Sequence, residues 1–139
     1  KGVIETVKKL NWSPDIIHLN GWFTSLFPLY MKTIYADDPI FLNSKIISSI
    51  YSRPFEGCLS KSLIKKIKFD GVEENIEILS DPDYFNLTDI MIKFSDSVIL
   101  SSPKTDKKII DLINKNSKDF LQYSDSQDDD KLMSFLNES

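Results

Sequence analysis

The chain has 139 residues, of which 41% are hydrophobic and 27% are charged, and its formal net charge is −4. These values are ordinary for one globular domain. A nucleic-acid or anionic-membrane partner would require a basic surface, which this charge does not provide. The single cysteine, Cys58, excludes an internal disulfide and suits a reducing cytoplasm. With only one histidine beside it there are too few ligands for a zinc site, so we expect a cytoplasmic protein without metal or cofactor.

The first residues predict a helix that is already under way. Val3, Val7 and Leu10 follow one another at i, i+4 and i+7, which is the spacing of an apolar helix face. There is no initiator methionine and no signal-peptide pattern. We therefore expect that upstream residues have been removed. No apolar stretch approaches the ~20 residues needed to span a bilayer.

The following elements alternate between strand and helix. Residues 15–19 predict a buried strand, and residues 22–35 predict a helix with a wide apolar face, in which Pro28 marks a kink or an early turn. Residues 45–51 predict a second strand. Residues 59–69 predict an amphipathic helix, whose lysines form its solvent-exposed face rather than a phosphate-binding patch.

The second half of the chain continues this alternation. Residues 83–94 predict a helix with Asp83 at its N-terminus, where an acid is favourable. Residues 97–101 predict a third strand, residues 105–114 a helix and residues 119–123 a short fourth strand.

The last helix is predicted over residues 126–137, with Leu132 and Leu136 on its inner face. The acidic run Asp128–Asp130 fits the first turn of this helix better than a metal site. Strands that alternate with helices imply a parallel sheet with helices on both faces. In such sheets ligands bind beyond the carboxyl ends of the strands, which directs attention to residues 18–22 and 51–57.

The residues of these two segments allow two interpretations each. His18 is either a polar group in a ligand crevice or a histidine that hydrogen-bonds to its neighbours. Trp22 either stacks on a sugar ring or is the first core residue of its helix. Gly21 allows close backbone approach or a positive φ. No glycine-rich phosphate loop and no Ser-His-Asp arrangement is present, so the residues alone predict an α/β domain with a candidate ligand crevice.

Residues 14–32 read P-D-I-I-H-L-N-G-W-F-T-S-L-F-P-L-Y-M-K. This segment resembles the signature of the bacterial glycogen/starch synthases, P-D-[IV]-[IV]-H, two residues, D-W-x-[TA], then x-L-x-P-x-Y-[LM]-K. Residues 55–57 resemble the end of the family's V-H-N-x-x-[YF]-x-G turn. Residues 94–103 resemble its A-D-x-[IV]-x-x-V-S-P strand and turn. The resemblance thus covers residues 1–103.

The resemblance implies a Rossmann-like three-layer α/β/α fold with a mostly parallel sheet. Such enzymes clamp a nucleotide-sugar between two Rossmann-like domains and transfer glucose from ADP-glucose to an α-1,4-glucan with retention. Residues 1–139 would be part of the N-terminal domain, without its start and without the C-terminal nucleotide-binding domain. We therefore expect these residues alone to be inactive, and we expect α-glucan and nucleotide-sugar as partners of the intact protein.

The chain departs from the family pattern at the donor site. Gly21 stands where the family has aspartate, Tyr51 where it has histidine, and Ser52 where it has the following asparagine. The substrate-binding residues by resemblance are His18, Gly21, Trp22 and Tyr51, and no catalytic residue can be named. Two alternatives remain open: His18 or Glu56 has taken over the lost contacts, or the chain is a degenerate, non-catalytic module that binds glucan or a partner protein.

Overall fold

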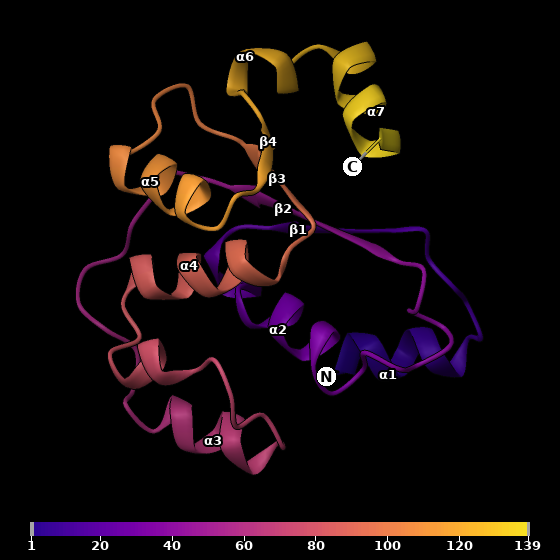
Figure 1. Cartoon of the computed structure of the whole chain (residues 1–139), viewed down its shortest axis with the longest axis vertical. Helices are drawn as coiled ribbons and strands as arrows, with labels where there is room; N and C mark the ends of the chain where they lie inside the picture. The colour runs from indigo at the N-terminus through magenta and orange to yellow at the C-terminus, as the bar shows by residue number, and fades with distance from the viewer. Residues whose placement is uncertain (1, 139) are drawn as a thin grey trace.

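The computed structural model describes residues 2–138 and contains one sheet of four parallel strands (Figure 1). The strands lie in sequence order and are β1 (Ile16–Asn20), β2 (Lys45–Ile50), β3 (Ser97–Leu100) and β4 (Asp119–Leu121). Every neighbouring pair is parallel. The predicted α/β fold with a parallel four-stranded sheet is confirmed, and each strand lies within two residues of its predicted bounds.

The helices fill the connections between the strands. They are α1 (Gly2–Lys9), α2 (Leu26–Lys32), α3 (Leu63–Phe69), α4 (Tyr84–Phe94), α5 (Lys107–Lys115), α6 (Tyr123–Ser126) and α7 (Asp129–Glu138), with 3-10 turns η1 (Trp22–Thr24) and η2 (Glu77–Ser80). In Figure 1, α2 and α4 lie below the sheet and α6 and α7 above it. The expected layers on both faces are therefore present.

The two faces of the sheet are covered unequally. Each connection leads to the next strand in the same direction, and right-handed crossovers then place their helices on one side. That first face buries Ile46, Ile50 and Val98 against α2, α4 and α5. The second face carries His18 and Ser49, and the end of α7 reaches it where Lys45 Nζ donates to the Asn137 carbonyl at 3.3 Å.

The predicted N-terminal helix is present as α1, but Val3 and Leu10 do not lie on its buried side. Their side chains are 68% and 69% exposed, whereas Ile4 is 1% exposed and packs with Val7 against the first face of the sheet. Ile4 and Val7 lie three residues apart, which also places them on one side of a helix. Periodicity alone could not separate these two apolar stripes, because both satisfy the helical spacing.

Three predicted helices begin later or are divided. Residues 22–35 form η1 and then α2, and Pro28 lies in the first turn of α2, where its missing N–H does no harm. The helix predicted over 59–69 begins only at Leu63, since the Ser60 hydroxyl accepts from the Ser62 N–H and offers the backbone a turn instead.

The last predicted helix begins later than predicted, at Asp129 as α7, and the short helix α6 before it (Tyr123–Ser126) was not predicted. The carboxylate of Asp128 accepts from the N–H groups of Asp130 and Lys131 and so begins α7 at this point. The interpretation of the acidic run as a helix start is confirmed. Asp83 likewise caps α4, because its carboxylate accepts from the Asn86 N–H at 2.7 Å.

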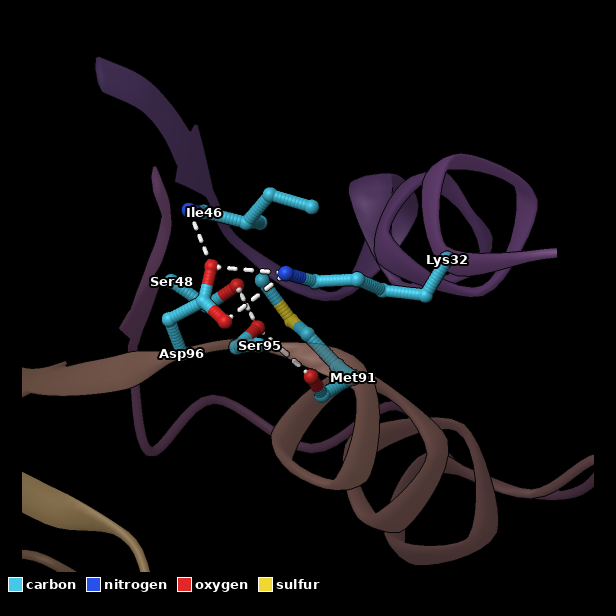
Figure 2. A network of polar contacts seen from close by, with 6 residues as sticks. All are labelled: Lys32, Ile46, Ser48, Met91, Ser95 and Asp96. Atoms are coloured by element: carbon cyan, nitrogen blue, oxygen red, sulfur yellow. Dashed lines mark hydrogen bonds and ion pairs between the residues drawn. The ribbon is translucent and has the colours of Figure 1, made fainter. Parts of the chain in front are cut away.

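Asp96 joins three elements immediately before β3 (Figure 2). Its N–H donates to the Ile46 carbonyl at 2.8 Å, and its carboxylate accepts from the Ile46 N–H at 2.8 Å. The same carboxylate accepts from Lys32 Nζ at 2.8 and 3.0 Å. Because β3 begins only at the next residue, the side chain supplies the acceptor that a strand carbonyl would otherwise offer to Ile46.

A buried pair of serines lies next to this contact (Figure 2). Ser95 Oγ donates to the Met91 carbonyl at 2.7 Å, and the hydroxyls of Ser48 and Ser95 lie 2.6 Å apart. The proton of Ser95 is thus committed to Met91, so Ser48 is the donor within the pair. Buried hydroxyls need such partners, and these bonds attach the end of α4 to the middle of β2.

The Asp96 contacts lead to a stability prediction. Asp96→Ala removes the acceptor of the Ile46 N–H and the partner of Lys32, and we expect it to lower the free energy of unfolding by about 1–3 kcal/mol. Urea denaturation measures the loss as a lower midpoint at unchanged slope. The control is Asp125→Ala, which breaks the exposed Lys131 ion pair and should cost less than about 1 kcal/mol. Equal losses in the two variants would contradict the assignment.

Candidate functional site

The carboxyl ends of β1 and β2 lie side by side. Asn20 is in register with Ser49, and the Gly21 N–H donates to the Ser49 carbonyl at 3.0 Å. The segments 18–22 and 51–57 therefore begin at the same edge of the sheet, as the sequence predicted. This edge is where parallel sheets bind their ligands.

Four polar side chains gather at this edge. His18 Nε2 lies 2.7 Å from Ser49 Oγ, and the Tyr51 hydroxyl donates to Asn20 Oδ1 at 3.2 Å. His18, Asn20 and Ser49 share the second face of the sheet, since they alternate with the core residues of their strands. We refer to His18, Asn20, Ser49 and Tyr51 as the strand-end cluster. Of its members, Ser49 is buried and the other three are exposed.

His18 is held as a neutral hydrogen-bonding group. Partial burial lowers the pKa of its imidazole below the ordinary histidine value, because the charged form loses hydration. Its partner Ser49 is a neutral hydroxyl that is only 2% exposed. The interpretation of His18 as a residue that hydrogen-bonds to its neighbours is confirmed, and its role toward a ligand stays a prediction.

Gly21 has a backbone conformation that other residues avoid. Its φ of 78° and ψ of 166° lie in a region that is essentially restricted to glycine. A Cβ atom added here would also lie 3.2 Å from Cε1 of Phe23. The expected positive φ is confirmed, and the turn from β1 into η1 depends on it.

Trp22 packs inward from this turn. Its ring centroid lies 4.7 Å from that of Phe55, and the side chain contacts two core clusters. This placement favours the interpretation of Trp22 as a core residue over a sugar-stacking one. The indole contacts Phe55 and so joins η1 to the loop that follows β2, next to the strand-end cluster.

Tyr84 fixes the backbone of this loop from α4. Its hydroxyl donates to the Tyr51 carbonyl at 2.6 Å, and its ring lies 6.1 Å from that of Phe55. Burial raises the pKa of Tyr84, so the hydroxyl keeps its proton and remains a donor. Sequence reasoning missed this role, because an aromatic residue at the start of a helix carries no signal of a contact 33 residues away.

Ser52 ties the same loop to the loop after β3. Its N–H donates to Ser102 Oγ at 2.9 Å, and its hydroxyl accepts from the Asp106 N–H at 3.3 Å. A hollow of about 200 Å³ opens here, and it is lined by Ser52, Pro54, Tyr84, Lys104, Thr105, Asp106 and Ile109. Glu56 lies exposed on the loop and makes no hydrogen bond to the strand-end cluster in the part of the chain that the structure describes.

Charged and metal-binding groups are scarce at this edge. Within residues 2–138 no three histidine, cysteine, aspartate or glutamate side chains gather in a way that could hold a metal ion. The strand-end cluster itself contains no lysine and no arginine. The cluster itself can therefore exchange hydrogen bonds with hydroxyl groups, whereas the cationic side chains near this edge, Arg53 and Lys104, lie on the neighbouring loops. In the same residues no helix is long and apolar enough to cross a membrane.

Comparison with known proteins assigns the chain to a family. Residues 1–122 match the family model of the starch synthase catalytic domain. The chain belongs to this family. The match to the family model ends at residue 122, just before α6 begins at Tyr123, so α6 and α7 lie outside it. No solved structure matches the chain.

The curated relatives are glycogen synthases. The chain is 36% identical to that of Chlorobaculum parvum over 112 residues, which cover 78% of the chain and 22% of the relative. It is 33% identical to that of Chlorobium phaeovibrioides over 108 residues, with the same two shares. It is 30% identical to that of Thermotoga maritima over 103 residues, 72% of the chain and 21% of the relative. The chain thus spans about a fifth of the length of these relatives.

The backbone of Gly21 leads to a second prediction. We expect Gly21→Ala to lower the free energy of unfolding by about 1–3 kcal/mol, since alanine is strained in this region of φ and ψ. Gly2→Ala is the matched control, because nothing lies within 4 Å of a Cβ at that position and it begins α1. Thermal unfolding of both variants measures the difference, and an unchanged midpoint for Gly21→Ala contradicts the strained turn.

The pKa of His18 leads to a third prediction. As the pH falls through the ordinary histidine range, near ~6.5, the unfolded chain takes up the proton before the folded chain does, so folding stability falls. The loss levels off below the lowered pKa of the folded state. Midpoints of thermal unfolding between pH 7 and pH 5 should fall less for His18→Gln than for the unmodified chain. Parallel curves would show that His18 titrates as it does in water.

Proposed function

We propose that the chain forms one wall of the donor crevice of a glucosyltransferase that moves glucose from ADP-glucose to an α-1,4-glucan. The observation that carries this proposal is the strand-end cluster at the carboxyl ends of β1 and β2, to which the signature segment contributes His18 and Asn20. The glycogen synthases among its relatives support the reaction class. No cofactor is needed, because the nucleotide diphosphate of the donor is itself the leaving group.

The wall supplies positioning rather than bond chemistry. Hydroxyl, amide and imidazole groups can orient the hydroxyls of the transferred glucose. Departure of a nucleoside diphosphate develops negative charge, and enzymes stabilise it with cationic side chains or convergent N–H donors. The strand-end cluster has no cationic side chain. We therefore propose that the groups which stabilise the leaving diphosphate lie outside residues 1–139, in a second domain that closes over the donor.

The partners and the cellular compartment that we propose follow from the same reaction. The partners would be the nucleotide-sugar and the α-glucan, with no nucleic acid and no membrane surface, and the compartment would be the cytoplasm. The domain limits proposed from the resemblance stand with this function: residues 1–139 are part of an N-terminal Rossmann-like domain. The matched residues make up only about a fifth of the relatives' length, which supports this proposal.

One observation favours a second function. The positions that would carry aspartate and histidine hold Gly21 and Tyr51, and each buried charged hydrogen bond lost to a ligand costs ~1.5–3 kcal/mol, about tenfold or more in affinity or rate. The alternative is a non-catalytic module that binds α-glucan or a partner protein. Glucose transfer by the full-length protein at rates typical of enzymes, ~10 s⁻¹, would exclude it.

The proposed division of labour leads to a fourth prediction. Purified residues 1–139 should transfer no detectable glucose from ADP-glucose to glycogen, because one wall can neither enclose the donor nor stabilise its leaving group. Incorporation of labelled glucose into glycogen is the measurement, with the full-length glycogen synthase of Chlorobaculum parvum as the positive control. Transfer by the 139-residue chain above the no-protein background would refute the proposal.

A further inference from the structure

A carboxylate at residue 21 would be strained in the turn from β1 into η1. An aspartate there would have to adopt a φ of 78° and a ψ of 166°, and its Cβ would press against Phe23. Gly21 is also turned away from the row of side chains on the second face, because it begins the turn into η1. The polar groups that can serve a ligand at this edge must come from neighbouring positions.

Asn20 is such a position. It is the last residue of β1, it lies in register with Ser49, and it shares the second face of the sheet with His18. Its Oδ1 accepts from the Tyr51 hydroxyl at 3.2 Å. Both side chains are exposed, Tyr51 by 38%. The bond therefore joins the ends of two strands at the surface, where a ligand can reach both partners.

The pair keeps unused hydrogen-bonding capacity on both sides. Asn20 Nδ2 carries two N–H donors, and within residues 2–138 they make no hydrogen bond of their own. The Tyr51 hydroxyl donates its hydrogen bond to Asn20, and its oxygen lone pairs can still accept one. A donor and an acceptor thus lie next to each other, and this pattern suits a sugar hydroxyl, which accepts one hydrogen bond and donates another.

We propose that Asn20 and Tyr51 form a neutral hydroxyl-binding pair that takes over the role of the aspartate and histidine expected at positions 21 and 51. The ligand is a glucose-bearing sugar, so this inference rests on the proposed function. Unlike a carboxylate, the amide of Asn20 does not repel a negatively charged diphosphate nearby. It also binds hydroxyls more weakly, because hydrogen bonds to a charged group are about twice as strong.

The test is a titration of the isotope-labelled 139-residue chain, followed by amide chemical shifts. The probes are methyl α-D-glucopyranoside and ADP-glucose, with ADP as the arm that lacks the sugar. We expect both sugar probes to shift the Asn20 side-chain amide and the backbone amides of residues 18–22 and 51–53, and ADP to leave them in place. Shifts with ADP of equal size would overturn the pair as a sugar site.

Variants separate binding by the pair from its role in the fold. Asn20→Ala and Tyr51→Phe should each raise the dissociation constant of the glucoside about tenfold, the effect of losing one ligand hydrogen bond. Asn20→Asp, which keeps the size of the side chain but removes its N–H donors, should raise it by a similar factor. Asn43→Ala is the matched control: it removes an exposed asparagine just before β2, at the opposite end of the sheet, and should change nothing.

The outcomes distinguish this inference from the proposed function. Binding of both sugar probes at this edge with the same affinity in Asn20→Ala, Tyr51→Phe and the unmodified chain overturns the pair and leaves the proposed function standing. No response of residues 18–22 and 51–53 to either sugar probe overturns both. A general loss of shift dispersion in Asn20→Ala would indicate unfolding, and Tyr51→Phe, which removes only one oxygen atom, then decides.

Discussion

The carboxylate of Asp96 holds together the segments that carry the candidate site. It accepts from Ile46 at the start of β2 while its own N–H donates to Ile46, so β2 and β3 can pair in only one register. The same carboxylate binds Lys32 at the end of α2. The position of β2 in turn fixes where its carboxyl end meets that of β1. The strand-end cluster therefore depends on a contact at the opposite end of the sheet.

This contact also explains what the family resemblance consists of. Lys32 closes the signature segment and Asp96 opens the later motif, and the two side chains, 64 residues apart, form one ion pair. The serine pair beside them attaches α4 to β2. Many of the matching residues thus build the scaffold, and at the edge formed by the ends of β1 and β2 the matching His18 lies beside Gly21 and Tyr51, where the chain departs from the pattern. A match of this kind identifies the fold and the family more firmly than it identifies the chemistry.

The sequence predicted the sheet well because each strand is a short, nearly continuous apolar run between clear turns. It predicted the ends of the helices less well. Whether α3 begins at residue 59 or at Leu63 depends on serine hydroxyls that compete with the helix, and which stripe of α1 is buried depends on its tertiary neighbours. At the site, the positive φ of Gly21 was foreseeable. The Asn20–Tyr51 bond was not, since strand register decides it.

The backbone of Gly21 and the chemistry of the edge are linked. The glycine-only turn lets η1 begin at once, so that Trp22 packs on Phe55 and supports the loop that carries Tyr51. A side chain at residue 21 is strained in that turn, so the same backbone that positions Tyr51 disfavours an aspartate there. The alternation of β1 leaves one nearby position on the ligand side, residue 20, next to His18 and Ser49. The Asn20–Tyr51 pair that we propose as a hydroxyl-binding site is therefore the arrangement that fits this turn.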